Sequence, residues 1–334
     1  MAVIEVHELR KRYGDTAALD GISLEVQAGE VFGLLGPNGA GKTTAVEIIE
    51  GLRTADSGTV RVLGLDPATD GPQLRERVGV QLQQAQLPEK MAVGEALELY
   101  AGFYRHPRPV PELLAEWGLA GKRTARFRTL SGGQKQRLFL ALALVGDPEL
   151  VFFDEITTGL DPAARRQAWE LVRRVRAQGV TVVLVSHLMD EAEELCDRVA
   201  IVDRGRVVAL DTPTALIDRS GSERRMRFRP PGPLPAGLVE AVPGVTGVAR
   251  SGSQVLVTGT GDFATGVTAV LAREHVLVAD LRLEQRTLDD AFLALTGRPM
   301  DDDELEAVPA DRRTTKKPEA VPADRRTTKK PEVR

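Results

Sequence analysis

Short apolar runs alternate with longer amphipathic stretches along the first two thirds of the chain. Residues 31–35 (VFGLL) form one such run, and its length and composition predict a short buried strand. Residues 44–50 have helical character and stop at Gly51, a typical helix terminator. The runs at 149–153 and 180–185 predict two further buried strands. This alternation continues to about Asp218 and is typical of a parallel α/β sheet.

Residues 36–43, between the first of these strands and its helix, read GPNGAGKT and match the spacing G-x-x-x-x-G-K-[ST]. A glycine loop there lets backbone N–H groups point inward, and the helix N-terminus adds partial positive charge. Lys42 would reach the β- and γ-phosphates of a nucleotide, and the Thr43 hydroxyl would bind Mg²⁺. A dinucleotide fold is excluded locally, because the third glycine of its loop is missing. The residues expected to bind the nucleotide here are Gly36, Pro37, Asn38, Gly39, Ala40, Gly41, Lys42, Thr43 and Thr44.

Two carboxylates, Asp154 and Glu155, follow the apolar run at 149–153. A strand that ends this way delivers them to the crevice where open α/β sheets bind ligands. One carboxylate can hold Mg²⁺ and the other can orient and deprotonate an attacking water. We therefore expect Asp154 to bind the metal and Glu155 to act as the base. Further upstream, Ser131 and the glycines after it predict the N-cap of an apolar helix and a second anion site.

Composition narrows the class of protein. A chain of 334 residues has room for two domains, and a net charge of −4 does not suggest a general nucleic-acid binder. The single cysteine, Cys196, rules out an internal disulfide and fits a reducing compartment. No apolar run approaches the roughly 18 residues that span a bilayer, and the N-terminus lacks a signal-peptide pattern. We expect a cytoplasmic protein that meets a membrane only through a partner.

In combination, these motifs resemble those of ABC-type ATPases, the ATP-binding cassettes of membrane transporters. Residues 36–43 match the Walker A motif, 150–155 match Walker B with its catalytic glutamate, and 130–134 match the family signature. Residues 158–161 match the D-loop, and the whole resemblance covers about residues 3–218 with the motifs in order. The family usually has proline after the catalytic glutamate, and this chain has Ile156.

The resemblance implies further site residues. Tyr13 would stack on adenine, His187 would contact the γ-phosphate, and Gln83 would serve both catalysis and Mg²⁺ binding. Several neighbouring glutamines leave the last assignment open to a shift of one or two positions; these are Gln81, Gln84 and Gln86. Lys42 and Glu155 complete the expected catalytic set. The signature and D-loop residues expected to meet nucleotide are Ser131, Gly132, Gly133, Gln134 and Asp161.

In this family the signature completes the site of a second cassette. The resemblance therefore implies two cassettes facing head to tail with two ATP molecules between them, in a homodimer or with a similar cassette. Ser131 and Gly133 of one cassette would contact the γ-phosphate held by Lys42 of the other. The segment at about 88–145 would be the helical subdomain, whose groove receives the cytoplasmic helices of a separate permease. No nucleic-acid partner is expected.

Residues 219–298 differ in character from the cassette expected at 1–218. Strand candidates lie at 226–229, 245–249, 254–258 and 276–283, and helix candidates lie at 238–241 and 263–273. Their order along the chain, β-α-β-β-α-β, predicts a small ferredoxin-like α+β domain. A helix at 288–297 would close it. This ending resembles drug-resistance cassettes of the daunorubicin/doxorubicin exporter type. Dimer contacts, regulation and simple stabilisation all remain open as its role.

The end of the chain, 299–334, is a low-complexity tail in which residues 306–318 recur as 319–331. Its composition predicts disorder, and its basic character leaves either weak membrane attraction or an inert tail. We expect the protein to be the ATP-hydrolysing subunit of an exporter of drugs or other hydrophobic compounds. The alternatives are a soluble ABC ATPase acting on ribosomes or DNA, and a regulator with an inactive cassette. The transported molecule is not specified by the sequence.

Overall fold

The computed structural model describes residues 1–81, 86–221, 223–235, 237–284 and 286–299. The expectations for Gln83 and for the repeated tail fall outside these residues. Within them, no helix is long and apolar enough to cross a membrane.

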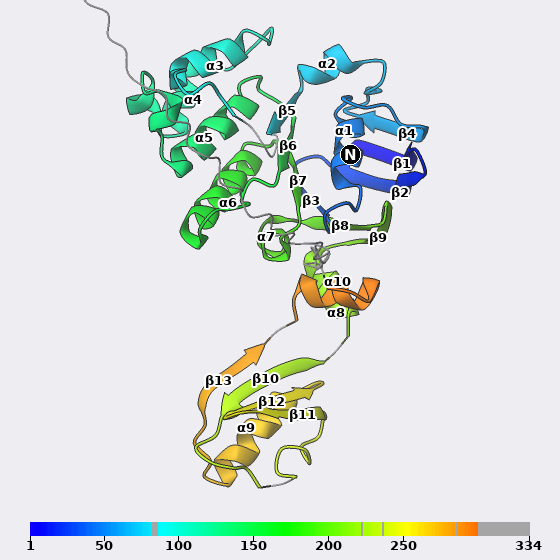
Figure 1. The fold of residues 1–334 in the computed structure, drawn as a ribbon, viewed down its shortest axis with the longest axis vertical. Coiled ribbons are helices and arrows are strands. Elements are labelled where there is room, and N and C mark those ends of the chain that lie inside the picture. Colours follow the sequence, from blue (N-terminus) through cyan, green and yellow to red (C-terminus); the bar gives the residue numbers. More distant parts are fainter. Residues whose placement is uncertain (82–85, 222, 236, 285, 300–334) are drawn as a thin grey trace, which may run out of the picture. The chain divides into compact units, whose positions relative to one another are not determined.

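A six-stranded sheet forms the centre of the cassette (Figure 1). Five neighbouring strands run parallel, and the sixth pairs antiparallel at one edge. In spatial order the strands are β5 (Val78–Gln81), β6 (Leu150–Asp154), β7 (Thr181–Ser186), β3 (Val31–Leu35), β8 (Arg198–Asp203) and β9 (Arg206–Asp211). The apolar runs form the interior strands because both faces of the sheet are covered.

Side chains that alternate along β3 enter two different cores. Phe32 and Leu34 join a core built with α1 and an antiparallel sheet, whereas Val31 and Leu35 join a core built with the other helices. The first core includes α1 (Lys42–Ile49), β2 (Thr16–Gln27), β1 (Ala2–Tyr13), β4 (Ser57–Val62) and α2 (Gly71–Arg75). The second includes α3 (Val93–Ala101), α4 (Val110–Glu116), α5 (Gly132–Ala143), α6 (Pro162–Ala177), α7 (Met189–Leu195) and α8 (Pro213–Arg219).

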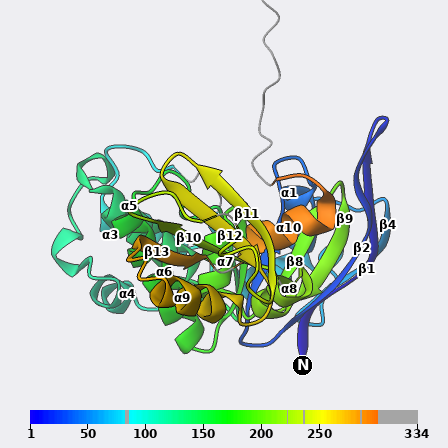
Figure 2. The ribbon, with the colours of Figure 1, turned by 90° about the horizontal axis from the view of Figure 1, so that it is seen from below.

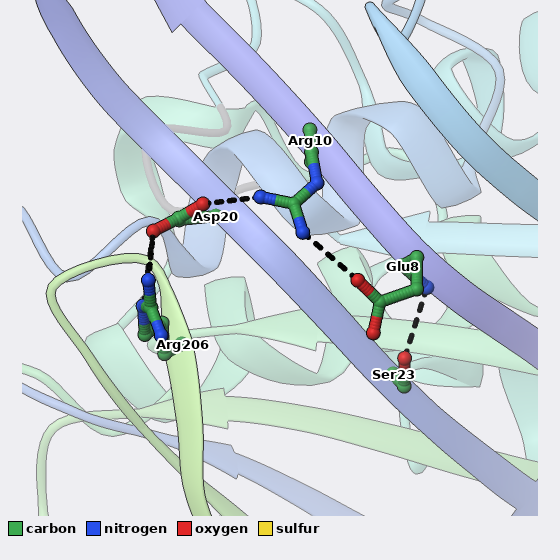
Figure 3. A network of polar contacts seen from close by, with 5 residues as sticks. All are labelled: Glu8, Arg10, Asp20, Ser23 and Arg206. Carbon is green, nitrogen blue, oxygen red and sulfur yellow. Dashed lines mark hydrogen bonds and ion pairs between the residues drawn. The ribbon is translucent and has the colours of Figure 1, made fainter.

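An ion-pair network ties the antiparallel sheet to the edge of the central sheet (Figure 3). Asp20 on β2 accepts hydrogen bonds at 2.5 Å from both Arg206 on β9 and Arg10 on β1. Arg10 also pairs with Glu8 at 2.9 Å. The hydrogen bond from Arg206 is the main reason why the pKa of Asp20 lies below its ordinary value. The network joins the consecutive strands β1 and β2 to β9, which lies far from them in sequence.

The small domain has the strand order of a ferredoxin-like fold. Its four-stranded antiparallel sheet is ordered β11-β12-β10-β13, and α9 packs its apolar face on the sheet through Phe263, Val267 and Leu271 (Figures 1 and 2). The elements are β10 (Arg224–Arg229), β11 (Val245–Ser251), β12 (Gln254–Gly259), α9 (Phe263–Arg273) and β13 (Ala279–Glu284). The helix expected at 238–241 is instead a turn, whose bonds include Ala241 N–H to Gly237 O and Val242 N–H to Val239 O.

The helix at the end of the described chain, α10 (Leu288–Thr296), does not close the small domain as expected. Its buried residues Leu288, Ala291 and Phe292 belong to the hydrophobic core of the cassette, where α10 contacts α7 and α8. Glu193 on α7 accepts a hydrogen bond from Leu288 N–H at 2.6 Å. The apolar face of α10 therefore completes the cassette, and the boundary expected at residue 219 does not separate this helix from it.

Candidate functional site

The glycine loop leaves β3 at Leu35 and enters α1 at Lys42. Two of its glycines are required by their surroundings. A Cβ on Gly36 (φ 154°) would lie 2.2 Å from the Val202 carbonyl oxygen, and one on Gly41 (φ 105°) would lie 2.4 Å from that of Ala18. The loop is thus wedged against the neighbouring backbone, and only glycine fits at either place.

The N-terminus of α1 is open to an anion. Its N-cap is Gly41, which offers no side chain to the first N–H groups, and the first turn carries no acidic residue. Lys42 is buried, and its Nζ donates to the carbonyl oxygens of Gly36 at 2.5 Å and of Pro37 at 3.0 Å. The ammonium therefore lies inside the loop, next to uncapped backbone donors. Together these groups form a cradle suited to phosphate.

Three further predicted residues gather beside this cradle, at the carboxyl ends of β6 and β7. Asp154 ends β6 opposite Val185, and Glu155 follows it. The Glu155 N–H donates to Val185 O at 2.9 Å, and one carboxylate oxygen lies 3.1 Å from His187 Nδ1. The other oxygen accepts a hydrogen bond from Thr158 Oγ1 at 3.4 Å. The Glu155 side chain is only 9% exposed, so its contacts with His187 and Thr158 hold a carboxylate that is largely shielded from solvent.

The backbone at Glu155 is strained, with φ at +50°. Non-glycine residues adopt this conformation rarely, and such strain often marks a functional position. Ile156, which stands where the family usually has proline, is buried in the core. An apolar side chain packed there anchors the turn that a proline ring would otherwise stiffen.

The electrostatics of the site favour a bound cation. Burial, and next the charge of Glu155, raise the pKa of Asp154 to about 6, while Lys42 acts in the opposite direction. An added cation would relieve this crowding of carboxylates. The donors, the Asp154 carboxylate and the exposed Thr43 hydroxyl, are hard oxygens of the kind that Mg²⁺ selects. Among the described residues no group of three His, Cys, Asp or Glu side chains is placed to hold a metal ion.

The other predicted residues lie at separate helix and strand ends. Ser131 is the N-cap of α5, where its Oγ accepts from Gln134 N–H and its N–H donates to Gln134 Oε1, so the predicted cap is confirmed. Asp161 caps α6 by accepting from Ala163 and Ala164 N–H at 2.9 and 3.0 Å. Tyr13 ends β1 and is 43% exposed.

The two glycines of the signature, Gly132 and Gly133, have free space where a side chain would fit. A Cβ on Gly132 would meet nothing within 4 Å, and one on Gly133 would meet only Gln167 Oε1 at 3.6 Å. Neither glycine has a positive φ. No contact within the described chain therefore explains why these positions carry no side chain.

Comparison with known proteins identifies the family. The family model described as ABC transporter matches residues 19–158. The daunorubicin/doxorubicin resistance ATP-binding protein of Streptomyces peucetius is 38% identical over 309 residues, which cover 90% of this chain and 94% of the relative. The chain belongs to the ABC transporter family of ATP-binding proteins. As an ABC ATPase it binds and hydrolyses ATP, so the predicted family and enzyme class are confirmed.

Other ABC proteins match at similar levels. A Nod factor export ATP-binding protein I of Paraburkholderia xenovorans is 40% identical over 310 residues, covering 90% of this chain and 99% of the relative. Among solved structures, an ATP-binding subunit of an ABC transporter gives a TM-score of 0.59 at 29% identity, covering 65% of this chain and 92% of that one. A dimeric post-hydrolysis ABC cassette bound to ADP and Pi gives 0.55 at 25% identity, covering 63% and 98%. The predicted cassette fold is confirmed.

Sequence reasoning missed two buried carboxyls of this ABC ATPase whose pKa is raised by burial. Glu50 lies at the end of α1, where burial, and next Asp154, raise its pKa to about 8. Glu191 on α7 is fully buried. A signal was present for Glu50, because an acidic residue ends the apolar face formed by Val46 and Ile49. Nothing local marks Glu191, which is one of several acidic residues in its helix.

Proposed function

We propose that this protein is the ATP-hydrolysing subunit of an exporter for drugs or other hydrophobic compounds, and that it powers a separate transmembrane permease. The observation that carries the proposal is the convergence of Lys42, Asp154, Glu155 and His187 beside an open helix N-terminus. The relatives that match nearly the whole chain are named for drug resistance and for export. A role on ribosomes or nucleic acid is not favoured by these relatives. Membrane attachment would come through the permease.

Each residue has a defined task in the proposed mechanism. Lys42, which now donates to carbonyls of its own loop, would turn to the β- and γ-phosphates. Thr43 and Asp154 would hold Mg²⁺, which would neutralise charge on the phosphates. Glu155 would take the proton of the attacking water. His187 would contact the γ-phosphate while its Nδ1 holds the Glu155 carboxylate. Tyr13, at the rim, would stack on adenine.

The proposal also assigns a second cassette to each site. Ser131 and Gly132 are exposed, Gly133 is half-buried, and both glycines have unused space, which fits the close approach of a phosphate from a partner subunit. A head-to-tail dimer would bring them to the γ-phosphate held by the partner's loop, with Asp161 close to the same interface. A dimeric cassette with ADP and Pi is among the similar structures.

Mixing two inactive variants tests the shared site. Lys42→Ala removes one half of each site and Ser131→Arg blocks the other, so each homodimer should lack ATPase activity. A mixed dimer retains one intact site, formed by the loop of the Ser131→Arg subunit and the signature of the Lys42→Ala subunit. We expect mixing to restore activity. If the mixture stays inactive while labelled subunits are shown to exchange, the shared site is wrong.

The exporter role needs a separate test. Purification of the tagged protein from detergent-solubilised membranes should recover a polytopic membrane protein that stimulates, or is stimulated by, ATP hydrolysis. Recovery of ribosomes or DNA with no membrane protein would refute the exporter role and leave the ATPase assignment unaffected.

A further inference from the structure

A group of buried polar side chains lies behind the Glu155–His187 pair and has no part in the mechanism above. Glu191 on α7 is 0% exposed, and neither of its carboxylate oxygens forms a hydrogen bond of ordinary geometry with the described residues. Thr157 Oγ1 and Trp169 Nε1 are also buried without such a bond. Buried polar groups are usually paired, so several unpaired ones together call for an explanation.

Three hydrogen-bonding side chains act on the Glu191 carboxylate. Burial raises the pKa of Glu191, and Ser186, Thr157 and Trp169 oppose that rise as hydrogen-bond donors. All three can donate a proton, and a carboxylate can accept from all three. The group is therefore one acceptor surrounded by donors, which come from β7, from the turn after Glu155 and from α6.

Two of the donors flank the proposed reacting groups. Thr157 is two residues beyond Glu155, in a turn closed by Thr158 N–H to Glu155 O at 3.2 Å and by Leu160 N–H to Thr157 O at 3.1 Å. Ser186 immediately precedes His187, and its Oγ accepts from Leu188 N–H at 3.0 Å. Because that bond uses an oxygen lone pair, the hydroxyl proton of Ser186 can point to Glu191.

The helix that carries Glu191 is firmly held. Met189, Ala192 and Leu195 are buried in the cassette core, and Asp190 pairs with Arg165 of α6 at 2.7 Å. Glu191 is thus a fixed point from which both flanking segments can be held. A displacement of about 1 Å at a reacting group can reduce a rate by about a hundredfold, so such a fixed point has catalytic value.

We infer that Glu191 is a positioning residue for ATP hydrolysis, and that its buried carboxylate, by accepting from Thr157 and Ser186 during the reaction, keeps Glu155 and His187 in register. This inference rests on the proposed roles of Glu155 and His187. Glu191 touches neither the nucleotide nor the water. It acts by connecting the two turns that carry the reacting groups.

Steady-state ATPase kinetics of the full chain test the inference, with Glu191→Gln, Glu191→Leu and Thr157→Val as variants. We expect kcat to fall by about tenfold to a hundredfold in Glu191→Leu and less in Glu191→Gln, which keeps one acceptor oxygen. KM for ATP should change by less than about threefold, because the phosphate loop is untouched. Glu194→Gln, on the exposed side of the same helix, is the matched control and should behave as wild type.

Thr157→Val removes the hydroxyl but keeps the shape of the side chain, so a loss of activity in this variant is not explained by misfolding. Its loss of kcat should resemble that of Glu191→Gln. The double variant with both changes should lose no more kcat than the more impaired of the two single variants, because both changes remove one connection. Wild-type kcat in Thr157→Val and Glu191→Gln, or multiplied losses in the double variant, would overturn the inference. A comparison with Glu155→Gln separates the two claims. If Glu155→Gln is inactive and Glu191→Leu is fully active, only the positioning role fails, whereas a fully active Glu155→Gln refutes the base itself.

Discussion

Replacing the proposed base by its amide, Glu155→Gln, is the most direct perturbation of the site. The glutamine side chain has the same shape, and both hydrogen bonds of the carboxylate can survive. The amide oxygen can accept from His187 Nδ1–H, now at 3.1 Å, and the amide nitrogen can face Thr158 Oγ1, now at 3.4 Å. The change therefore removes basicity and charge while it leaves the geometry intact.

Because only basicity and charge are lost, the expected fall in turnover is that of a missing general base. Loss of a positioned general base costs about 10²–10⁴ in rate, or about 3–5 kcal/mol in the barrier. Nucleotide binding should not weaken, because Lys42 and the N-terminus of α1 are unchanged. The charge of Glu155 also helps to raise the pKa of Asp154 to about 6, so its removal should lower that pKa. Asp154 then stays ionised at lower pH, which maintains its capacity to hold a cation.

Two measurements on the same protein check this reasoning. Phosphate release at saturating ATP reports turnover, and titration with a fluorescent ATP analogue in the presence of Mg²⁺ reports affinity. Glu170→Gln, which changes an exposed carboxylate of α6 paired with Arg173, is the control for loss of one negative charge. Turnover of Glu155→Gln within about threefold of wild type would refute the reasoning, because no general base could then be at that position.

Three further predictions concern stability and fit. Glu50→Gln should stabilise the nucleotide-free protein above pH 8, by at most about 5 kcal/mol. The folded-state pKa of Glu50 is raised from 4.5 to about 8, so the stability of the wild type falls as the pH rises through that window. Urea unfolding should show the full difference above pH 8 and almost none below the ordinary pKa of 4.5. Gly132→Ala should leave the melting temperature unchanged or higher yet abolish most ATPase activity, whereas Gly121→Ala, with equally free space, should have the same effect on the melting temperature and leave the activity unchanged. Phe292→Ala should cost about 3–5 kcal/mol in chemical denaturation because that ring is fully buried in the cassette core, and an equal loss in Leu295→Ala, which is 47% exposed, would contradict this packing.

The sequence by itself determined the features that depend on neighbours along the chain. The alternation of strands and helices, the glycine loop before Lys42, the cap at Ser131 and the carboxylates after β6 all follow from local spacing. Such features are readable because backbone conformation and capping are decided within a few residues. The gathering of chemistry at one edge of the sheet was also predictable, because parallel strands end together.

The tertiary structure alone decided what depends on contacts between distant segments. The pairing of Glu155 with His187, the burial of Glu50 and the enclosure of Glu191 arise where separate elements meet. The apolar face of α10 is plain in the sequence, but its partner could have been either core, and only packing assigns it to the cassette. An amphipathic pattern specifies that a face must be buried and does not specify against what.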